Sequence, residues 1–157
     1  IQRFGCSLYS PEEAEWLIDH ASSIDIVQAP YSVLDRRFET VFIRLKKEFQ
    51  TEIHVRSVFL QGLYFKNIKE LPQKLQPLKG YIAEIQSMAH EKEVSLATLL
   101  MSYPLKNPLI DGVLTGIDNT AQLEENLSSL EGLVSNLPEI PVQKEHLELL
   151  NPANLKE

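Results

Sequence analysis

The feature that most limits the fold is a strand pattern followed by a helix pattern, repeated along the chain. Short apolar runs predict four strands, at residues 1–8, 25–30, 52–60 and 110–116. Apolar residues at helical spacing follow each run, at residues 10–21, 38–49, 81–90 with 94–103, and 119–130. Connections of this length predict parallel strands, because parallel neighbours cannot be joined by a tight turn.

Two α/β architectures have this element order: an open doubly wound sheet and a (β/α)8 barrel. A complete barrel takes eight strands and about 250 residues, whereas this chain has 157 residues. The prediction is four consecutive βα units that form half of a barrel over residues 1–135. Residues 136–157 are predicted to be a Pro-punctuated C-terminal tail with a short helix near 142–150. The chain begins at Ile1 inside a predicted strand, so we expect further sequence to precede it.

Two connections carry clear local signals. Ser10-Pro11-Glu12-Glu13 predicts a helix start, with Ser10 as the cap and Glu13 three residues later as in a capping box. Residues 62–80 contain Pro72 and Pro77 and predict an irregular connection that borders the binding edge of the sheet.

The composition narrows the class of protein. A formal net charge of −7 argues against a protein that binds nucleic acid through phosphate contacts. The single Cys6 permits neither an intramolecular disulfide nor a thiolate metal cluster, and it fits a reducing compartment. No apolar run approaches the roughly 18 residues of a membrane span, and the four histidines lack metal-ligand spacing. We therefore expect a cytoplasmic protein without membrane, nucleic-acid or metal partners.

Polar residues stand at the carboxyl end of each predicted strand, where parallel α/β folds bind ligands. They are Ser7, Gln28, Arg56 with Ser57, and the segment 116–119. Polar residues are also common in turns and loops, which is an alternative explanation for any one of them. Four such strand ends together favour a binding site. The segment 116–119 precedes a predicted helix, so it either binds a phosphate or simply caps that helix.

These strand ends carry a family resemblance. The segments FGCSLYSPEEAE, DIVQAPYSVLDRRF, HVRSVFLQGL and IDGVLTGIDNTAQLEEN, in this order, resemble strands five to eight of the aldo/keto reductase family. The resemblance implies the C-terminal half of a (β/α)8 barrel from an oxidoreductase. It also implies a nicotinamide cofactor, usually NADPH, and a small carbonyl substrate in the full-length parent.

The resemblance assigns cofactor-binding roles along the chain. Ser7 and Gln28 correspond to residues that contact the nicotinamide carboxamide. Arg56 stands where many relatives place an aromatic side chain on the nicotinamide ring. The backbone along the pyrophosphate corresponds to Ser57, Val58, Phe59 and Leu60. The adenosine end corresponds to Gly116, Ile117, Asp118, Asn119, Gln122, Glu125 and Asn126.

Two departures from the family pattern bear on function. Many NADPH-dependent relatives have a serine at the position of Asp118, so the choice between NADP(H) and NAD(H) stays open. The family's catalytic Asp, Tyr, Lys and His belong to the first four strands and match nothing in this sequence. We therefore expect no catalytic residues in this chain and no carbonyl reduction by the chain alone.

Two other interpretations remain. The chain could be a non-catalytic half-barrel module that binds a nucleotide or self-associates, because a homodimer would bring eight strands together. A flavodoxin-like open sheet that binds another nucleotide is the third interpretation, and the absence of a Gly-rich first turn argues against it.

Overall fold

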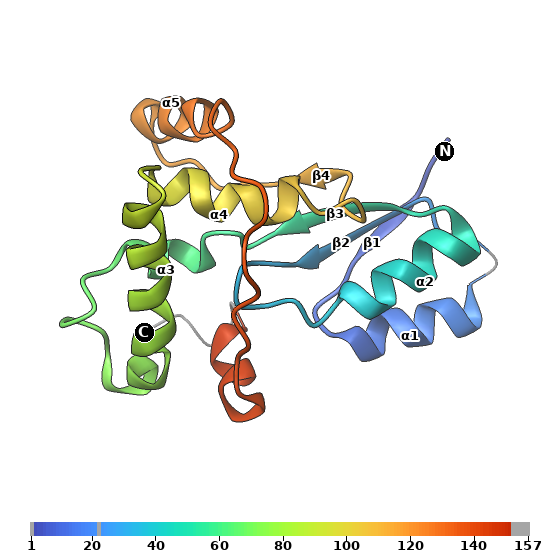
Figure 1. Cartoon of the computed structure of the whole chain (residues 1–157). Helices are drawn as coiled ribbons and strands as arrows, with labels where there is room; N and C mark the ends of the chain where they lie inside the picture. Colours follow the sequence, from blue (N-terminus) through green and yellow to red (C-terminus); the bar gives the residue numbers. More distant parts are fainter. Residues whose placement is uncertain (1, 22, 152–157) are drawn as a thin grey trace.

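The computed structural model describes residues 2–21 and 23–151, and four of its segments form one parallel sheet (Figure 1). The strands pair in chain order and are β1 (Gly5–Ser7), β2 (Ile26–Pro30), β3 (Glu52–Arg56) and β4 (Gly112–Val113). The predicted α/β class with parallel strands is confirmed. The first residue of the first predicted strand and the last six of the predicted tail lie outside the described residues.

The predicted strands are right in place but too long. The third was predicted to reach Leu60, yet β3 ends at Arg56 because the next residue, Ser57, has a φ of 64°. Left-handed backbone cannot continue a strand. The fourth was predicted over 110–116, but only Gly112 and Val113 are strand, with one further ladder hydrogen bond on each side.

The helices follow the predicted pattern closely. They are α1 (Pro11–His20), α2 (Glu39–Phe49), α3 (Lys79–Glu91), α4 (Leu96–Leu105) and α5 (Thr120–Ser128). The capping box of α1 is confirmed: Glu13 N donates to Ser10 Oγ, and Glu13 Oε2 accepts from Ser10 N, both at 3.3 Å. The connection predicted to be irregular holds two 3-10 helices, η1 (Leu60–Phe65) and η2 (Gln73–Leu78), and a third, η3 (Lys144–Leu150), lies in the tail.

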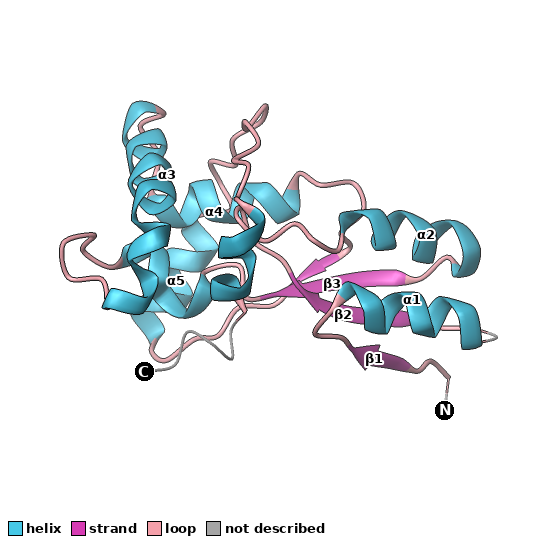
Figure 2. Cartoon of the chain, turned by 90° about the horizontal axis from the view of Figure 1, so that it is seen from below, coloured by secondary structure: helices cyan, strands magenta, loops and turns pink. Residues whose placement is uncertain are grey.

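One face of the sheet is buried beneath helices (Figure 2). Val27, Ile53 and Val55 point from β2 and β3 into a core that includes Phe42 of α2 and Ala14 of α1. A second cluster joins α3, α4 and the three 3-10 helices, and it buries Ile140 and Leu150 of the tail. The domain boundary at residue 135 stays a prediction.

The other face of the sheet is polar and more exposed. Ser7, Gln28, His54 and Gly112 share one register row across the four strands. A Cβ on Gly112 would lie 2.9 Å from the His54 ring, so glycine permits this close approach. Strands in chain order, with their buried face under helices, match a barrel segment rather than a doubly wound sheet, which reverses its strand order and has helices on both faces.

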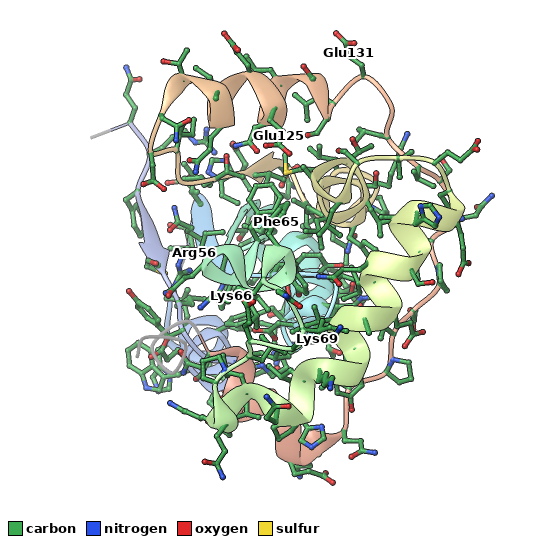
Figure 3. All side chains as sticks on the ribbon, turned by 90° about the vertical axis from the view of Figure 1, so that its left-hand side faces the viewer. Arg56, Phe65, Lys66, Lys69, Glu125 and Glu131 are labelled. Atoms are coloured by element: carbon green, nitrogen blue, oxygen red, sulfur yellow. The ribbon has the colours of Figure 1, made fainter. Side chains whose placement is uncertain are left out.

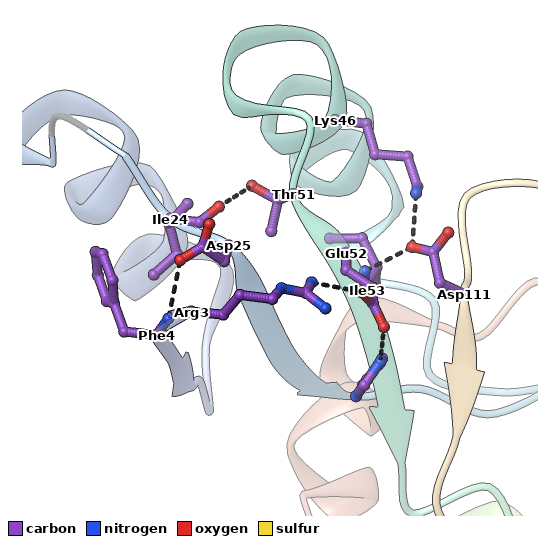
Figure 4. A network of polar contacts seen from close by, with 10 residues as sticks. Arg3, Phe4, Ile24, Asp25, Lys46, Thr51, Glu52, Ile53 and Asp111 are labelled. Atoms are coloured by element: carbon purple, nitrogen blue, oxygen red, sulfur yellow. Dashed lines mark hydrogen bonds and ion pairs between the residues drawn. The ribbon is translucent and has the colours of Figure 1, made fainter. Parts of the chain in front are cut away.

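Polar contacts tie the amino-terminal ends of the strands together (Figure 4). Asp111, just before β4, accepts from Ile53 N at 2.7 Å and from Lys46 Nζ at 2.6 Å. Thr51 is buried and donates to the carbonyl of Ile24 at 3.0 Å. These contacts fix the strand register at the end opposite to the predicted binding edge.

Candidate functional site

A groove of about 730 Å³ lies at the carboxyl ends of β3 and β4, between η1 and α5. Eight of the fourteen predicted cofactor-binding residues line it: Ser57, Val58, Phe59, Gly116, Asp118, Gln122, Glu125 and Asn126. The fold thus brings together two sequence segments that lie far apart in the chain. The other predicted residues lie elsewhere: Ser7, Gln28, Arg56, Leu60, Ile117 and Asn119 do not line the groove.

One wall of the groove is a tight turn after β3. Ser57, Leu60, Gln61 and Gly62 all have positive φ, from 43° to 79°. The turn is closed by Leu60 N donating to Ser57 O and Gly62 N to Phe59 O, both at 2.9 Å. Left-handed conformations in non-glycine residues are costly and cluster at functional sites.

The side chains of this turn are shared between the cores and the groove, and Val58 and Phe59 contribute to both. Val58 is buried in the core beneath the sheet and Leu60 in the second cluster, where it is only 1% exposed. Phe59 and Gln61 line the groove. The two cores therefore hold the turn in place. Since the Leu60 side chain is buried, only the backbone of Leu60 is still predicted to contact a cofactor.

The opposite wall is the start of α5. Asn119 is the N-cap residue, and its Oδ1 accepts from Gln122 N at 3.0 Å. Gln122 Oε1 in turn accepts from Asp118 N at 2.8 Å. Helix capping, one of the two explanations for segment 116–119, is therefore confirmed for Asn119. No described residue of α5 is buried, so its side chains remain available to a ligand.

Six further lining residues were not predicted individually, among them Phe65 and Thr115. Phe65 of η1 is 46% exposed and packs edge-on against Phe59, with ring centroids 5.6 Å apart. Such an exposed ring suits stacking against a planar ligand group. Phe65 was missed because the stretch 62–80 has no periodicity from which to infer the direction of a side chain.

The predicted nicotinamide-binding residues form a second group, on the polar face of the sheet. Ser7 and Gln28 are register partners on β1 and β2. Arg56 reaches across both strand ends: its Nη2 donates to Leu8 O at 3.1 Å and its Nη1 to Gln28 O at 3.4 Å. Its guanidinium also lies 4.6 Å from the centroid of the Tyr9 ring. These contacts explain an arginine at the end of an apolar strand, because they satisfy its charge at the mouth of the sheet.

The charge of the groove is entirely negative. In the part of the chain that the structure describes, its only charged lining residues are Asp118 and Glu125. Figure 3 shows Glu125 on the side of α5 that faces Phe65, with Lys66 and Lys69 on the far side of Phe65. Both carboxylates are exposed to solvent.

Other chemistry near the strand ends is limited. Burial raises the pKa of the Cys6 thiol, and the nearby Glu13 carboxylate raises it further, so Cys6 is a poor nucleophile at neutral pH. Within residues 2–21 and 23–151, no group of three or more His, Cys, Asp or Glu side chains could hold a metal ion. No helix in that part of the chain is long and apolar enough to cross a bilayer.

Parallel strands in chain order, helices packed on one face and a groove at the carboxyl ends define half of a (β/α)8 barrel. The chain belongs to the aldo/keto reductase family, whose family model matches residues 1–136. No curated protein sequence matches the chain.

Solved structures share the fold. Aldo-keto reductase AKR11C1 from Bacillus halodurans in its apo form is similar over 96% of this chain, with a TM-score of 0.66 and 20% identity. The holo form of the same protein gives a TM-score of 0.62 at 21% identity, again over 96% of this chain. The match covers 50% and 49% of those chains, so this chain spans about half their length.

Proposed function

We propose that this chain is the cofactor-binding half of an NAD(P)H-dependent oxidoreductase that reduces a small carbonyl compound. The observation that supports this most is the groove, because it unites the turn after β3 with the start of α5, the two segments that the family resemblance assigns to the pyrophosphate and the adenosine. The single Cys6 supports a cytoplasmic location.

Each end of the site has a distinct task in this proposal. The Ser7 hydroxyl and the Gln28 amide can both donate and accept hydrogen bonds, so they suit the nicotinamide carboxamide. Arg56 positions the ends of β1 and β2 on which these two side chains stand. Phe65 offers a ring face to the adenine.

The dinucleotide supplies hydride transfer when bound, and this chain binds and orients it. The groups that would donate the proton to the carbonyl oxygen match nothing in this sequence. The chain alone is therefore expected to bind cofactor and to reduce no carbonyl.

The direct test is a titration of the chain with NADH and with NADPH, followed by the fluorescence of the reduced nicotinamide. Gln28→Ala should weaken binding about fivefold, as expected for the loss of one net hydrogen bond. Gln73→Ala is the matched control, because Gln73 is exposed on η2 and does not line the groove. No binding of either cofactor at millimolar concentration would refute the proposal.

A second candidate function is self-association of the half-barrel. The polar face that carries Ser7, Gln28 and His54 would line the interior of a closed barrel, and β1 and β4 each pair with a single strand in the described sheet. Unpaired strand edges are sites of association. Sedimentation separates the cases, because a stable monomer of 17.9 kDa would reject closure by a second copy.

A further inference from the structure

Among the residues that the structure describes, no cation lines the groove, and this bears on which dinucleotide the groove accepts. Of the two forms, NADPH carries an additional phosphate on the adenosine ribose, with a charge of about −1.5 to −2 at neutral pH. Within residues 2–21 and 23–151, the charged side chains on the walls are the carboxylates of Asp118 and Glu125 alone. Both would repel that phosphate, whereas a carboxylate accepts a hydrogen bond from a ribose hydroxyl.

We infer that this groove selects the dinucleotide without the 2′-phosphate, so that the protein uses NADH in preference to NADPH. The inference rests on the proposed function, because it assigns the groove to the adenosine end of the cofactor.

Two backbone donors beside the groove already have partners. Asp118 N is occupied by Gln122 Oε1, and Gln122 N by the cap residue Asn119. The amides of Asp118 and Gln122 are thus already satisfied, and the Asp118 carboxylate, just before the cap residue, lies near the positive end of the helix.

The cations that flank the turn in sequence, Arg56, Lys66 and Lys69, do not line the groove. Arg56 precedes the turn directly, but its guanidinium donates to the carbonyls of Leu8 and Gln28. Lys66 and Lys69 lie beyond Phe65 when seen from Glu125 (Figure 3).

The test compares NADH and NADPH affinities of the full chain with those of Asp118→Asn and Glu125→Gln. The unmodified chain, which is the parent of these variants, should bind NADH at least about tenfold more tightly than NADPH at low ionic strength. Each variant should reduce this ratio of NADH affinity to NADPH affinity by about fivefold, mainly through tighter NADPH binding. The ratio should also narrow as salt rises, because both carboxylates are exposed and salt screens them.

The matched control is Glu131→Gln. Glu131 follows α5 and points away from Phe65 in Figure 3, and it does not line the groove. This variant has the same change in net charge as the other two, so it should leave the NADH-to-NADPH ratio unchanged.

The outcomes separate this inference from the proposed function. Binding of neither cofactor by the parent would overturn the assignment of the groove, and the inference with it. Binding of both with equal or tighter affinity for NADPH would leave the proposed function standing and overturn the selection alone. A ratio that is the same in the two groove variants as in the parent, or that moves equally in Glu131→Gln, would show that these carboxylates do not select the cofactor.

Discussion

Arg56 should stabilise the folded chain through the carbonyl groups that it bridges at the ends of β1 and β2. Arg56→Met keeps an apolar stem of similar shape but removes the guanidinium. The loss comprises one good charged hydrogen bond to Leu8 O at 3.1 Å, a weak one to Gln28 O at 3.4 Å, and a stacking contact with the exposed Tyr9 ring at 4.6 Å. The first is worth about 1.5 kcal/mol net and the last about 0.5 kcal/mol at an exposed site.

The sum predicts that Arg56→Met lowers the free energy of unfolding by about 2 kcal/mol, which corresponds to a fall in Tm of about 4–8 °C for a chain of this size. Urea unfolding followed by circular dichroism measures the change. Tyr9→Leu removes only the stacking contact and should cost about 0.5 kcal/mol. Adding the second substitution to Arg56→Met should then cost almost nothing more, because the two residues share one contact. An Arg56→Met chain within about 0.5 kcal/mol of the parent would refute this account of the arginine.

Three further predictions concern the scaffold. Ser10→Ala should lower the free energy of unfolding by about 1 kcal/mol through loss of the α1 cap, measured by urea unfolding. Thr51→Val should cost about 1–2 kcal/mol in the same assay, because it leaves the Ile24 carbonyl without its buried donor. Partial burial alone would raise the pKa of Asp111, but hydrogen bonds from Lys46 and Ile53 N outweigh it and lower the pKa. Because folding lowers its pKa, Asp111 stabilises the folded chain at pH values above its unfolded pKa of about 4. This stabilisation is lost as the pH falls through the pKa of Asp111 in the folded chain. The stability difference between the parent and Asp111→Asn should therefore shrink on acidification below about pH 4.

The order and type of the elements could be predicted from sequence because each carries its own periodicity. The capping box before α1 is equally local, since Ser10 and Glu13 are three residues apart. The end of β3 could not be predicted. The residues Val58 to Leu60 continue an apolar run, and nothing in their composition shows that one joins the core beneath the sheet and another a different core. Burial on both sides of a turn has the same sequence pattern as burial in a strand.

The sequence likewise predicts which residues of the candidate site lie at the same edge of the sheet, but not the directions of their side chains. The carboxyl ends of parallel strands lie at one edge of the sheet, so their polar residues can be grouped from the sequence alone. The direction of each side chain could not be predicted in the same way. Arg56 donates to the carbonyl groups of Gln28 and Leu8, which precede it in the sequence by 28 and 48 positions. The charge of the groove depends on which carboxylates of α5 face Phe65, and α5 has no buried residue from which its orientation could be inferred.

The two ends of the proposed site differ in how far they are preformed. The turn at Ser57–Gly62, which is proposed to lie along the pyrophosphate, is held by buried side chains in two cores, so this wall of the groove is preformed. Ser7, by contrast, is exposed on a strand of only three residues. Cofactor affinity measured on this chain should therefore report mainly on the groove, which is the proposed pyrophosphate and adenosine end. That is the end where NADH and NADPH differ, so the choice between them can be tested in a chain that performs no reduction.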